Sequence, residues 1–336
     1  MAFLSEKPDI TCKSPLFAAI LGNTILSTVP GISGAGPSPE KTLLTPNLDA
    51  ELITEGEITS TTGNPNTPTG CPTPATITRA MMVLTGMKPL FINAGLRYPP
   101  SVPCFDVYGD VAGDPRTGDA LPSAARLFIQ GERIGSFLSE RSDLLVLGEC
   151  VPGGTTTSLC LLRALGYEAS VSSSFVNNPL PLKEEVCRQV LERTKAGGHT
   201  TPLDLVRSLG DPMMPVAAGI AKSYSGMLIL AGGTQMLAVG ALIRALGQKL
   251  PRVVTTSYVR DDPTANVRAL ARQIGVHVTY VDPGFGDLGH AGLARYCIGE
   301  VKEGMGAGGA MYLANLMGHS PDAIRRAILS TVTGYP

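Results

Sequence analysis

The chain has 336 residues, of which 43% are hydrophobic, so it can form one large or two ordinary domains with a packed core. With 27 basic and 28 acidic residues and no basic block, the sequence argues against nucleic acid or an anionic membrane as a partner. Seven cysteines without a Cys-x-x-Cys pair indicate reduced thiols and a cytoplasmic protein. Only four isolated histidines are present, so we expect no metal site.

The first 75 residues are expected to form an irregular arm. Pro, Gly, Thr and Asn dominate from residue 29 to 74, and one apolar stretch, 16–25, precedes them. Because apolar residues remain interspersed, we predict that this arm packs on the main body and forms part of a smaller lobe.

Residues 76–303 are predicted to form the nucleotide-binding domain, because short apolar strands alternate there with helices. Strands are predicted near 90–92, 144–147, 169–171, 227–230, 253–254 and 276–281, and helices over 183–196, 235–246 and 265–274. The alternation predicts an α/β fold with a mainly parallel, Rossmann-like sheet and helices on both faces. In such sheets, ligands bind beyond the carboxyl ends of the strands.

The unit at 144–157 is the most informative. An apolar strand is followed by Glu149, two glycines and three threonines that start a helix. This geometry presents backbone N–H groups and a helix N-terminus to an anion, usually a phosphate. The predicted ligands are Gly153, Gly154, Thr155, Thr156 and Thr157. Glu149 would repel a phosphate, so we expect it to transfer a proton or to bind another part of the ligand; a tight connection with a threonine N-cap is the alternative.

Other strand ends carry small polar residues that would complete a pocket. Lys183 opens a helix just beyond one strand end, where a phosphate needs a counter-charge, although most single lysines are solvated. Further candidates for phosphate or ribose binding are Ser173, Asn178, Gly232, Gly233, Thr256 and Ser257. The apolar stretch 227–246 is interrupted by its glycines and is interpreted as a strand and a helix, not a membrane span.

The C-terminal segment begins with Glu303, a run of small residues over 304–310, and helices near 306–317 and 321–332. Two interpretations of Glu303 stay open: a general base above a ligand-binding helix start, or an acidic side chain stabilised by the helix dipole. We expect residues 304–336 to pack with the N-terminal arm as the smaller lobe.

Taken together, these segments resemble the nicotinate-nucleotide:dimethylbenzimidazole phosphoribosyltransferase family, most closely its archaeal and cyanobacterial branch. The matching segments are Ile32-Ser33 with Gly36, Thr67–Arg79, Gly148–Thr157, Ser172–Lys183, Gly210–Gly219, Leu230–Ala238 and Lys302–Ala310. Two segments depart from the family pattern: Gly154–Thr157 lacks the usual asparagine, and Asn93-Ala94-Gly95 replaces Asp-His-Gly. Both lie where the base and ribose would be contacted.

The resemblance implies transfer of ribose 5-phosphate from nicotinate mononucleotide, as co-substrate without another cofactor, to a benzimidazole-type base in cobamide synthesis. It implies that Glu303 and Glu149 are catalytic, that the glycine–threonine loop and Lys183 hold the phosphate, and that the protein is a homodimer. Adenine as acceptor and a non-catalytic nucleotide-binding protein remain alternatives. A transferase using a magnesium-bound diphosphate donor is a third, but Asp261-Asp262 lacks the apolar strand that precedes such a pair.

Overall fold

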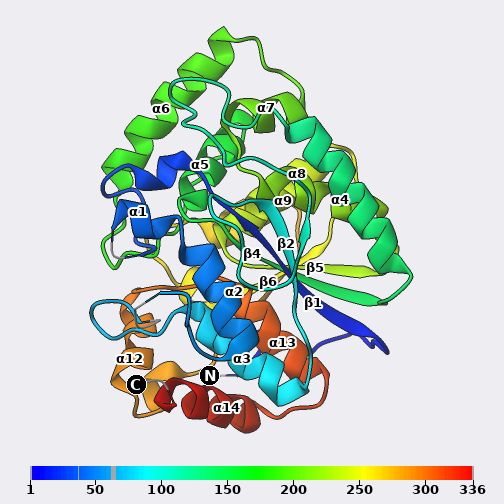
Figure 1. Cartoon of the computed structure of the whole chain (residues 1–336), viewed down its shortest axis with the longest axis vertical. Coiled ribbons are helices and arrows are strands. Elements are labelled where there is room, and N and C mark those ends of the chain that lie inside the picture. Colours follow the sequence, from blue (N-terminus) through cyan, green and yellow to red (C-terminus); the bar gives the residue numbers. More distant parts are fainter. Residues whose placement is uncertain (1, 37, 62–65, 335–336) are drawn as a thin grey trace.

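The computed structural model describes residues 2–36, 38–61 and 66–334. Within these residues, seven parallel strands form one sheet in the order β3-β2-β1-β4-β5-β6-β7 (Figure 1). The strands are β1 (Pro15–Gly22), β2 (Leu90–Gly95), β3 (Cys104–Asp106), β4 (Leu144–Cys150), β5 (Met227–Ala231), β6 (Arg252–Thr256) and β7 (Val278–Val281). The predicted α/β fold with a parallel sheet is confirmed.

The first strand corrects the expectation of an irregular arm over residues 1–75. Residues 15–22 pair with β2 on one side and β4 on the other, at the centre of the sheet. Phe17 and Leu21 pack into the core on one face, whereas Ala18 and Ile20 pack on the other. A strand buried on both faces has a continuous apolar sequence, as residues 16–22 have. The expectation was wrong because a long connection separates β1 from the next strand. The alternation of short strands and helices that predicted the other strands is therefore missing around β1.

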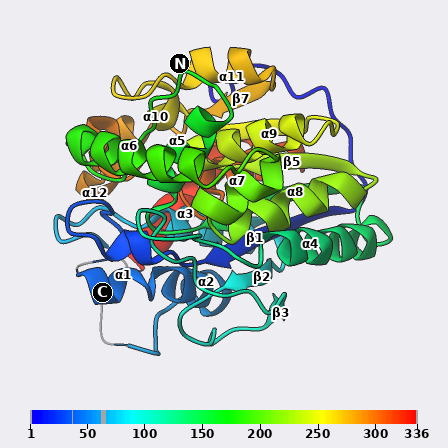
Figure 2. The same ribbon diagram turned by 90° about the horizontal axis from the view of Figure 1, so that it is seen from above.

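Helices cover both faces of the sheet, as predicted. Figure 2 looks onto one layer, behind which the strands follow one another from β7 to β3. This layer contains α4 (Ala124–Ser139), α5 (Gly154–Ala164), α6 (Leu180–Ala196), α7 (Pro202–Leu209), α8 (Met213–Ser223), α9 (Thr234–Ala245) and α11 (Val267–Ile274). The opposite layer contains α2 (Thr45–Glu55), α3 (Pro74–Thr85), α13 (Ala307–Leu316) and α14 (Pro321–Thr333).

The second layer joins the two ends of the chain. Helix α3 packs against α2 from the N-terminal segment and against α13 and α14 from the C-terminal segment (Figure 1). The short helices are α1 (Pro39–Thr42), α10 (Ser257–Arg260) and α12 (Ala291–Ala294), with 3₁₀ turns η1 (Ile25–Thr28), η2 (Phe285–Asp287) and η3 (Arg295–Ile298).

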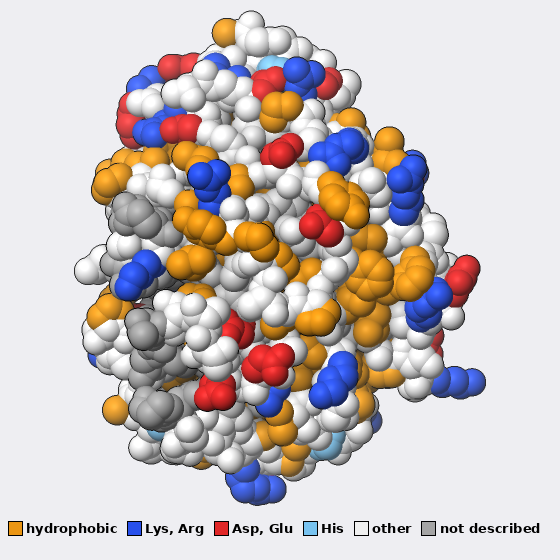
Figure 3. Space-filling view, in the orientation of Figure 1, with side chains coloured by type: hydrophobic (Ala, Val, Ile, Leu, Met, Phe, Trp, Pro, Cys, Tyr) orange, Lys and Arg blue, Asp and Glu red, His pale blue; other side chains and the backbone are white. Residues whose placement is uncertain are grey.

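The surface agrees with the balanced charge of the sequence. On the face shown in Figure 3, Lys and Arg side chains are scattered among Asp and Glu side chains and do not form one basic block. In the part of the chain that is described, no helix has the length and apolar character needed to span a membrane.

The strand predicted at 169–171 is wrong. This segment forms no regular secondary structure; the place beside β4 is taken by β5, and side chains satisfy the segment's backbone instead of a strand. Ser170 N donates to Asn266 Oδ1 at 2.9 Å, and Val171 O accepts from Asn178 Nδ2 at 2.9 Å. The short apolar run predicted a strand where the backbone pairs with side chains and not with the sheet.

Candidate functional site

The carboxyl edge of the sheet gathers the strand ends chosen from the sequence. Because β4, β5 and β6 are neighbours, Glu149, Gly232-Gly233 and Thr256 lie side by side at this edge. The segment 302–305 crosses these ends. Thr256 Oγ1 donates to Lys302 O at 2.6 Å, and Met305 N donates to Glu149 O at 3.0 Å. Glu303 is thereby brought next to the ends of three strands.

Glu149 is buried at the end of β4, and its Oε2 accepts a hydrogen bond from Val151 N at 3.2 Å. A Cβ placed on Gly232 would lie 2.9 Å from Met236 Cγ and 3.4 Å from Glu149 Oε1, so the glycine leaves room for the Met236 side chain next to this carboxyl. Burial and the negative charges of Asp211 and Glu303 raise the pKa of Glu149 to about 8. The side chain is therefore protonated at neutral pH and can donate a hydrogen bond.

The Glu303 carboxyl is partly buried and lies at the start of α13. It accepts hydrogen bonds from Gly308 N at 3.2 Å and from Thr256 N at 3.2 Å. Gly304 N and the Thr255 hydroxyl also donate to it. Burial raises the pKa of Glu303 to about 7, although these hydrogen bonds favour the ionised form. Both interpretations of Glu303 therefore fit: it caps a helix, and it can exchange a proton near neutral pH.

The glycine–threonine loop is closely packed at the start of α5. Gly153 has φ +79° and is the N-cap of the helix; a Cβ there would lie 3.0 Å from Ser27 Cβ. A Cβ on Gly154 would lie 1.8 Å from Gln235 Oε1. Thr156 is fully buried, and its hydroxyl has no hydrogen-bond partner among the described residues. The loop thus has the shape predicted, with one hydroxyl unsatisfied.

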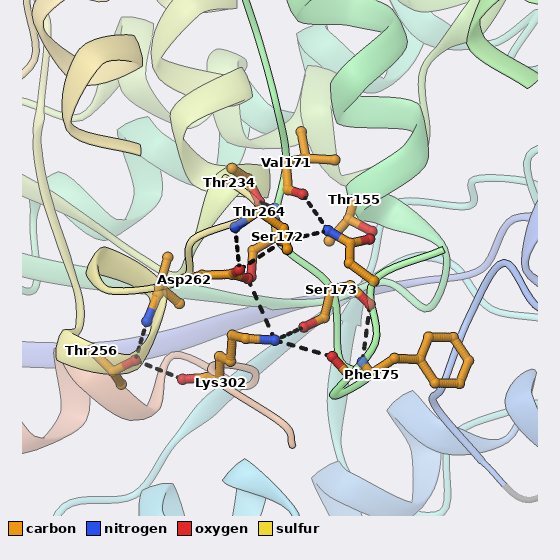
Figure 4. Close-up of polar contacts among 12 residues, drawn as sticks. Thr155, Val171, Ser172, Ser173, Phe175, Thr234, Thr256, Asp262, Thr264 and Lys302 are labelled. Carbon is orange, nitrogen blue, oxygen red and sulfur yellow. Dashed lines mark hydrogen bonds and ion pairs between the residues drawn. The ribbon is translucent and has the colours of Figure 1, made fainter. Parts of the chain in front are cut away.

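Lys183 and Lys302 are both buried, and Lys183 contacts this loop. Figure 4 shows Lys302 with its Nζ near Asp262. The Nζ of Lys183 donates to Thr155 Oγ1 at 3.1 Å and to Ser172 O at 2.9 Å. Burial and the nearby charge of Lys302 lower the pKa of Lys183 to about 7. Burial also lowers the pKa of Lys302, whose Nζ lies 3.4 Å from Asp262 Oδ2. Lys183 Nζ is therefore enclosed 3.1 Å from a hydroxyl in the first turn of α5, and Lys302 Nζ lies beside Asp262.

Two of the remaining predicted ligands, Ser173 and Asn178, already make contacts within the protein, although Asn178 Oδ1 has no hydrogen-bond partner among the described residues. Ser173 Oγ accepts from Phe175 N at 2.9 Å, and Asn178 Nδ2 donates to Thr264 Oγ1 at 2.8 Å. Ser257 is the first residue of α10 and is buried. These residues hold the walls of the site, whereas the glutamates, the loop and the lysines form its charged part. Among the described residues, no group of three His, Cys, Asp or Glu side chains is arranged to hold a metal ion.

Comparison with known proteins gives the chain a family. No family model matches the sequence. Relatives from Methanosarcina mazei and Thermococcus onnurineus, both described as UPF0284 proteins, are 41% and 42% identical over 97% and 93% of this chain, and over 95% of each relative. The chain belongs to the UPF0284 family.

The fold of this UPF0284 chain also matches solved structures. The crystal structure of nicotinate-nucleotide-dimethylbenzimidazole phosphoribosyltransferase from Thermus thermophilus aligns with a TM-score of 0.61 and 15% identity, covering 96% of this chain and 84% of that one. A structure of CobT from the same organism gives a TM-score of 0.61 and 16% identity. The likeness establishes a shared fold.

Sequence reasoning missed three charged residues of the UPF0284 site. Asp211 is fully buried before α8, and its Oδ2 lies 2.6 Å from Thr157 Oγ1. Burial raises the pKa of Asp211 to about 6. Lys302 precedes Glu303 and carries no pattern of its own, and Asp262 was interpreted only as part of an acidic pair. Asp211 alone fits no motif, but it lies within Gly210–Gly219, one of the segments that resemble the phosphoribosyltransferase family. That resemblance could have marked it as a candidate.

Proposed function

We propose that this protein is a phosphoribosyltransferase that moves ribose 5-phosphate from nicotinate mononucleotide to a benzimidazole-type base and releases nicotinate. The observation that carries the proposal is the placement of two carboxyls with different pKa values, Glu149 and Glu303, at the same sheet edge as the glycine–threonine loop and Lys183. The fold shared with a nicotinate-nucleotide-dimethylbenzimidazole phosphoribosyltransferase supports the same reaction class.

In the proposed reaction, an imidazole nitrogen of the base attacks C1′ of the donor with its lone pair. The bond from C1′ to the nicotinate nitrogen breaks, and its electron pair stays on that nitrogen, which was a cationic pyridinium. Glu303 accepts the proton that the base loses, which is general-base catalysis worth about 10²–10⁴-fold in rate. Protonated Glu149 avoids repelling the donor phosphate, and an ionised Glu303 stabilises positive charge developing on the ribose.

The experiment is release of nicotinate from nicotinate mononucleotide by the purified protein, with benzimidazoles and adenine supplied in turn. We expect Glu303→Gln to lower the turnover rate at least about 100-fold with little change in nucleotide affinity, because the amide cannot take a proton. Glu140→Gln, at an exposed position, is the matched control. Wild-type turnover in the Glu303→Gln variant would remove Glu303 from the mechanism.

A binding protein without catalysis is the second candidate. It is favoured by the hydrogen bonds that the Glu303 carboxylate already accepts from Gly304, Gly308 and Thr256, because a purely structural cap would look the same. This function predicts saturable binding of nicotinate mononucleotide without nicotinate release from any base, and binding that is indifferent to Glu303→Gln.

A further inference from the structure

One short backbone segment accepts hydrogen bonds from both buried lysines. Residues 172–175, which we name the carbonyl strap, have no regular secondary structure. Lys302 Nζ donates to Ser173 O at 2.8 Å and to Phe175 O at 3.2 Å, and Figure 4 shows its side chain pointing between these carbonyls. Lys183 Nζ donates to Ser172 O. Three carbonyls of the strap thus accept from two ammonium groups that lie far apart in the sequence.

The charges of this cluster do not balance. Asp262 is its one carboxylate among the described residues in contact with the lysines; it lies 3.4 Å from Lys302 and accepts from Ser172 Oγ at 2.6 Å. The described partners of Lys183 are neutral, a hydroxyl and a carbonyl. Burying a cation without a counter-charge is costly. Lys183, whose pKa is about 7, is therefore only partly protonated at neutral pH, and an anionic ligand would stabilise its charged form.

A phosphate would be a stronger partner for these lysines than the strap. An anionic oxygen adds to the hydrogen bond an attraction between opposite charges that a neutral carbonyl does not provide, and this attraction is large in a buried site. The strap is otherwise held by single contacts, such as Ser172 N to Thr234 Oγ1 at 3.3 Å and Val301 N to Ser174 O at 3.2 Å. It can therefore shift without breaking a helix or the sheet. The unpartnered hydroxyl of Thr156 is on the same helical turn as Thr155, which accepts from Lys183.

We propose that the carbonyl strap holds the place of a phosphate monoester, whose oxygens replace the strap carbonyls on Lys183 and Lys302 when the ligand enters. Lys302 then becomes a second phosphate-binding residue, and the strap is released as the site fills. The inference deepens the proposed function, on which it rests for the identity of the phosphate-bearing ligand as a nucleotide.

The test measures binding of inorganic phosphate and of nicotinate mononucleotide to the full chain, together with hydrogen exchange of the backbone amides of residues 173–176. We expect saturating phosphate to speed this exchange, and Lys302→Met to weaken the binding of both ligands by about 10-fold or more. Lys195→Met, an exposed lysine on the same helix as Lys183, should bind both as the wild type does.

Asp262→Asn separates ligand binding from a structural role of the cluster. It removes the carboxylate that competes for Lys302, so phosphate should bind at least as tightly as in the wild type, even if Lys302→Met proves unstable. Equal loss of binding in Asp262→Asn and Lys302→Met would overturn the proposal, as would unchanged or slower exchange of residues 173–176 with phosphate bound.

The outcomes also separate this inference from the proposed reaction. If phosphate releases the strap but no base yields nicotinate, the reaction fails and the inference stands. If nicotinate is released and Lys302→Met leaves the KM for nicotinate mononucleotide unchanged, the reaction stands and the inference fails.

Discussion

The hydroxyl of Thr157 has two possible hydrogen-bond acceptors, one of which is the buried carboxyl of Asp211. Its Oγ1 lies 3.0 Å from Gly154 O and 2.6 Å from Asp211 Oδ2, yet a hydroxyl has one hydrogen to donate. Asp211 Oδ2 is the closer acceptor, so Thr157 donates to the Asp211 carboxyl, and this hydrogen bond opposes the rise that burial gives the pKa of Asp211. Burial raises the pKa values of both Asp211 and Glu149, but only that of Glu149, at about 8, lies above neutral pH, so Glu149 keeps its proton while Asp211 is ionised.

The pH dependence of the proposed reaction follows from these carboxyls. Glu303 must lose its proton to act as a base, so kcat/KM for nicotinate mononucleotide should rise through pH about 7. Glu149 must keep its proton beside the phosphate, and Lys183, whose pKa is about 7, must keep its proton to hold that phosphate, so kcat/KM should fall on the alkaline side. Because the two carboxyls interact, the profile reports apparent values of the pair. Initial rates of nicotinate release between pH 5.5 and 9.5 would measure it.

Glu149→Gln provides the check on this assignment, because glutamine imitates the protonated acid and cannot ionise. The variant should keep activity near neutral pH and show a weaker decline on the alkaline side, since only the part due to Lys183 remains. An unchanged alkaline decline would assign it to another group, and a loss of activity at every pH would show that Glu149 must exchange a proton.

At the residue scale, the sequence predicted side chains that follow strands and missed those brought in by tertiary packing. Glu149 and Gly153 flank an apolar strand, and this local pattern places them at the carboxyl edge. Nothing in the sequence around Asp211 shows that it lies beside Thr157, 54 residues earlier in the chain. Contacts of this kind depend on how α8 packs against the rest of the layer, which local patterns do not contain.

At the element scale, the units whose strand, loop and helix are contiguous were predicted well. The unit at 144–164 appears as β4, the glycine loop and α5, and the unit at 227–245 as β5 and α9. β1 lies at the centre of the sheet but is separated in sequence from both of its neighbours, so its pairing had no local signal. The alternation of strand and helix patterns along the sequence predicts the elements, whereas the order of the strands in the sheet depends on long-range contacts.

The close packing of Gly308 in the first turn of α13 leads to a testable prediction. A Cβ on Gly308 would lie 2.8 Å from Glu303 Oε2 and 2.8 Å from the carbonyl carbon of Thr255. Gly308→Ala should therefore displace the Glu303 carboxyl and lower the turnover rate, with a loss of about 1–3 kcal/mol in the free energy of unfolding. Nicotinate release and urea denaturation would measure the two effects.

Gly118→Ala is the matched control for this change, because a Cβ at Gly118 meets no atom within 4 Å. It should leave both quantities unchanged. A Gly308→Ala protein with wild-type turnover would mean that the carboxyl of Glu303 need not stay against the helix.

At the scale of the whole molecule, one buried acid links the N-terminal helices to the sheet. Asp49 on α2 accepts from Thr73 Oγ1 at 3.0 Å, at the N-cap of α3, and from Cys150 Sγ at 3.6 Å, at the end of β4. Burial raises the pKa of Asp49 to about 7. The contact between the N-terminal segment and the edge of the sheet is therefore formed by a protonated carboxyl.

The global stability should consequently fall as pH rises. The folded chain keeps the Asp49 proton up to pH about 7, whereas the unfolded chain loses it near 4, so the folded state is favoured at low pH. One such group lowers the free energy of unfolding by about 1.4 kcal/mol per pH unit between these values. Asp49→Asn cannot ionise, so its urea-unfolding free energy should decline less steeply from pH 5 to 7, by about that slope. Asp287→Asn, at an exposed position, should follow the wild type; parallel declines of wild type and Asp49→Asn would mean that Asp49 is ionised in the folded protein.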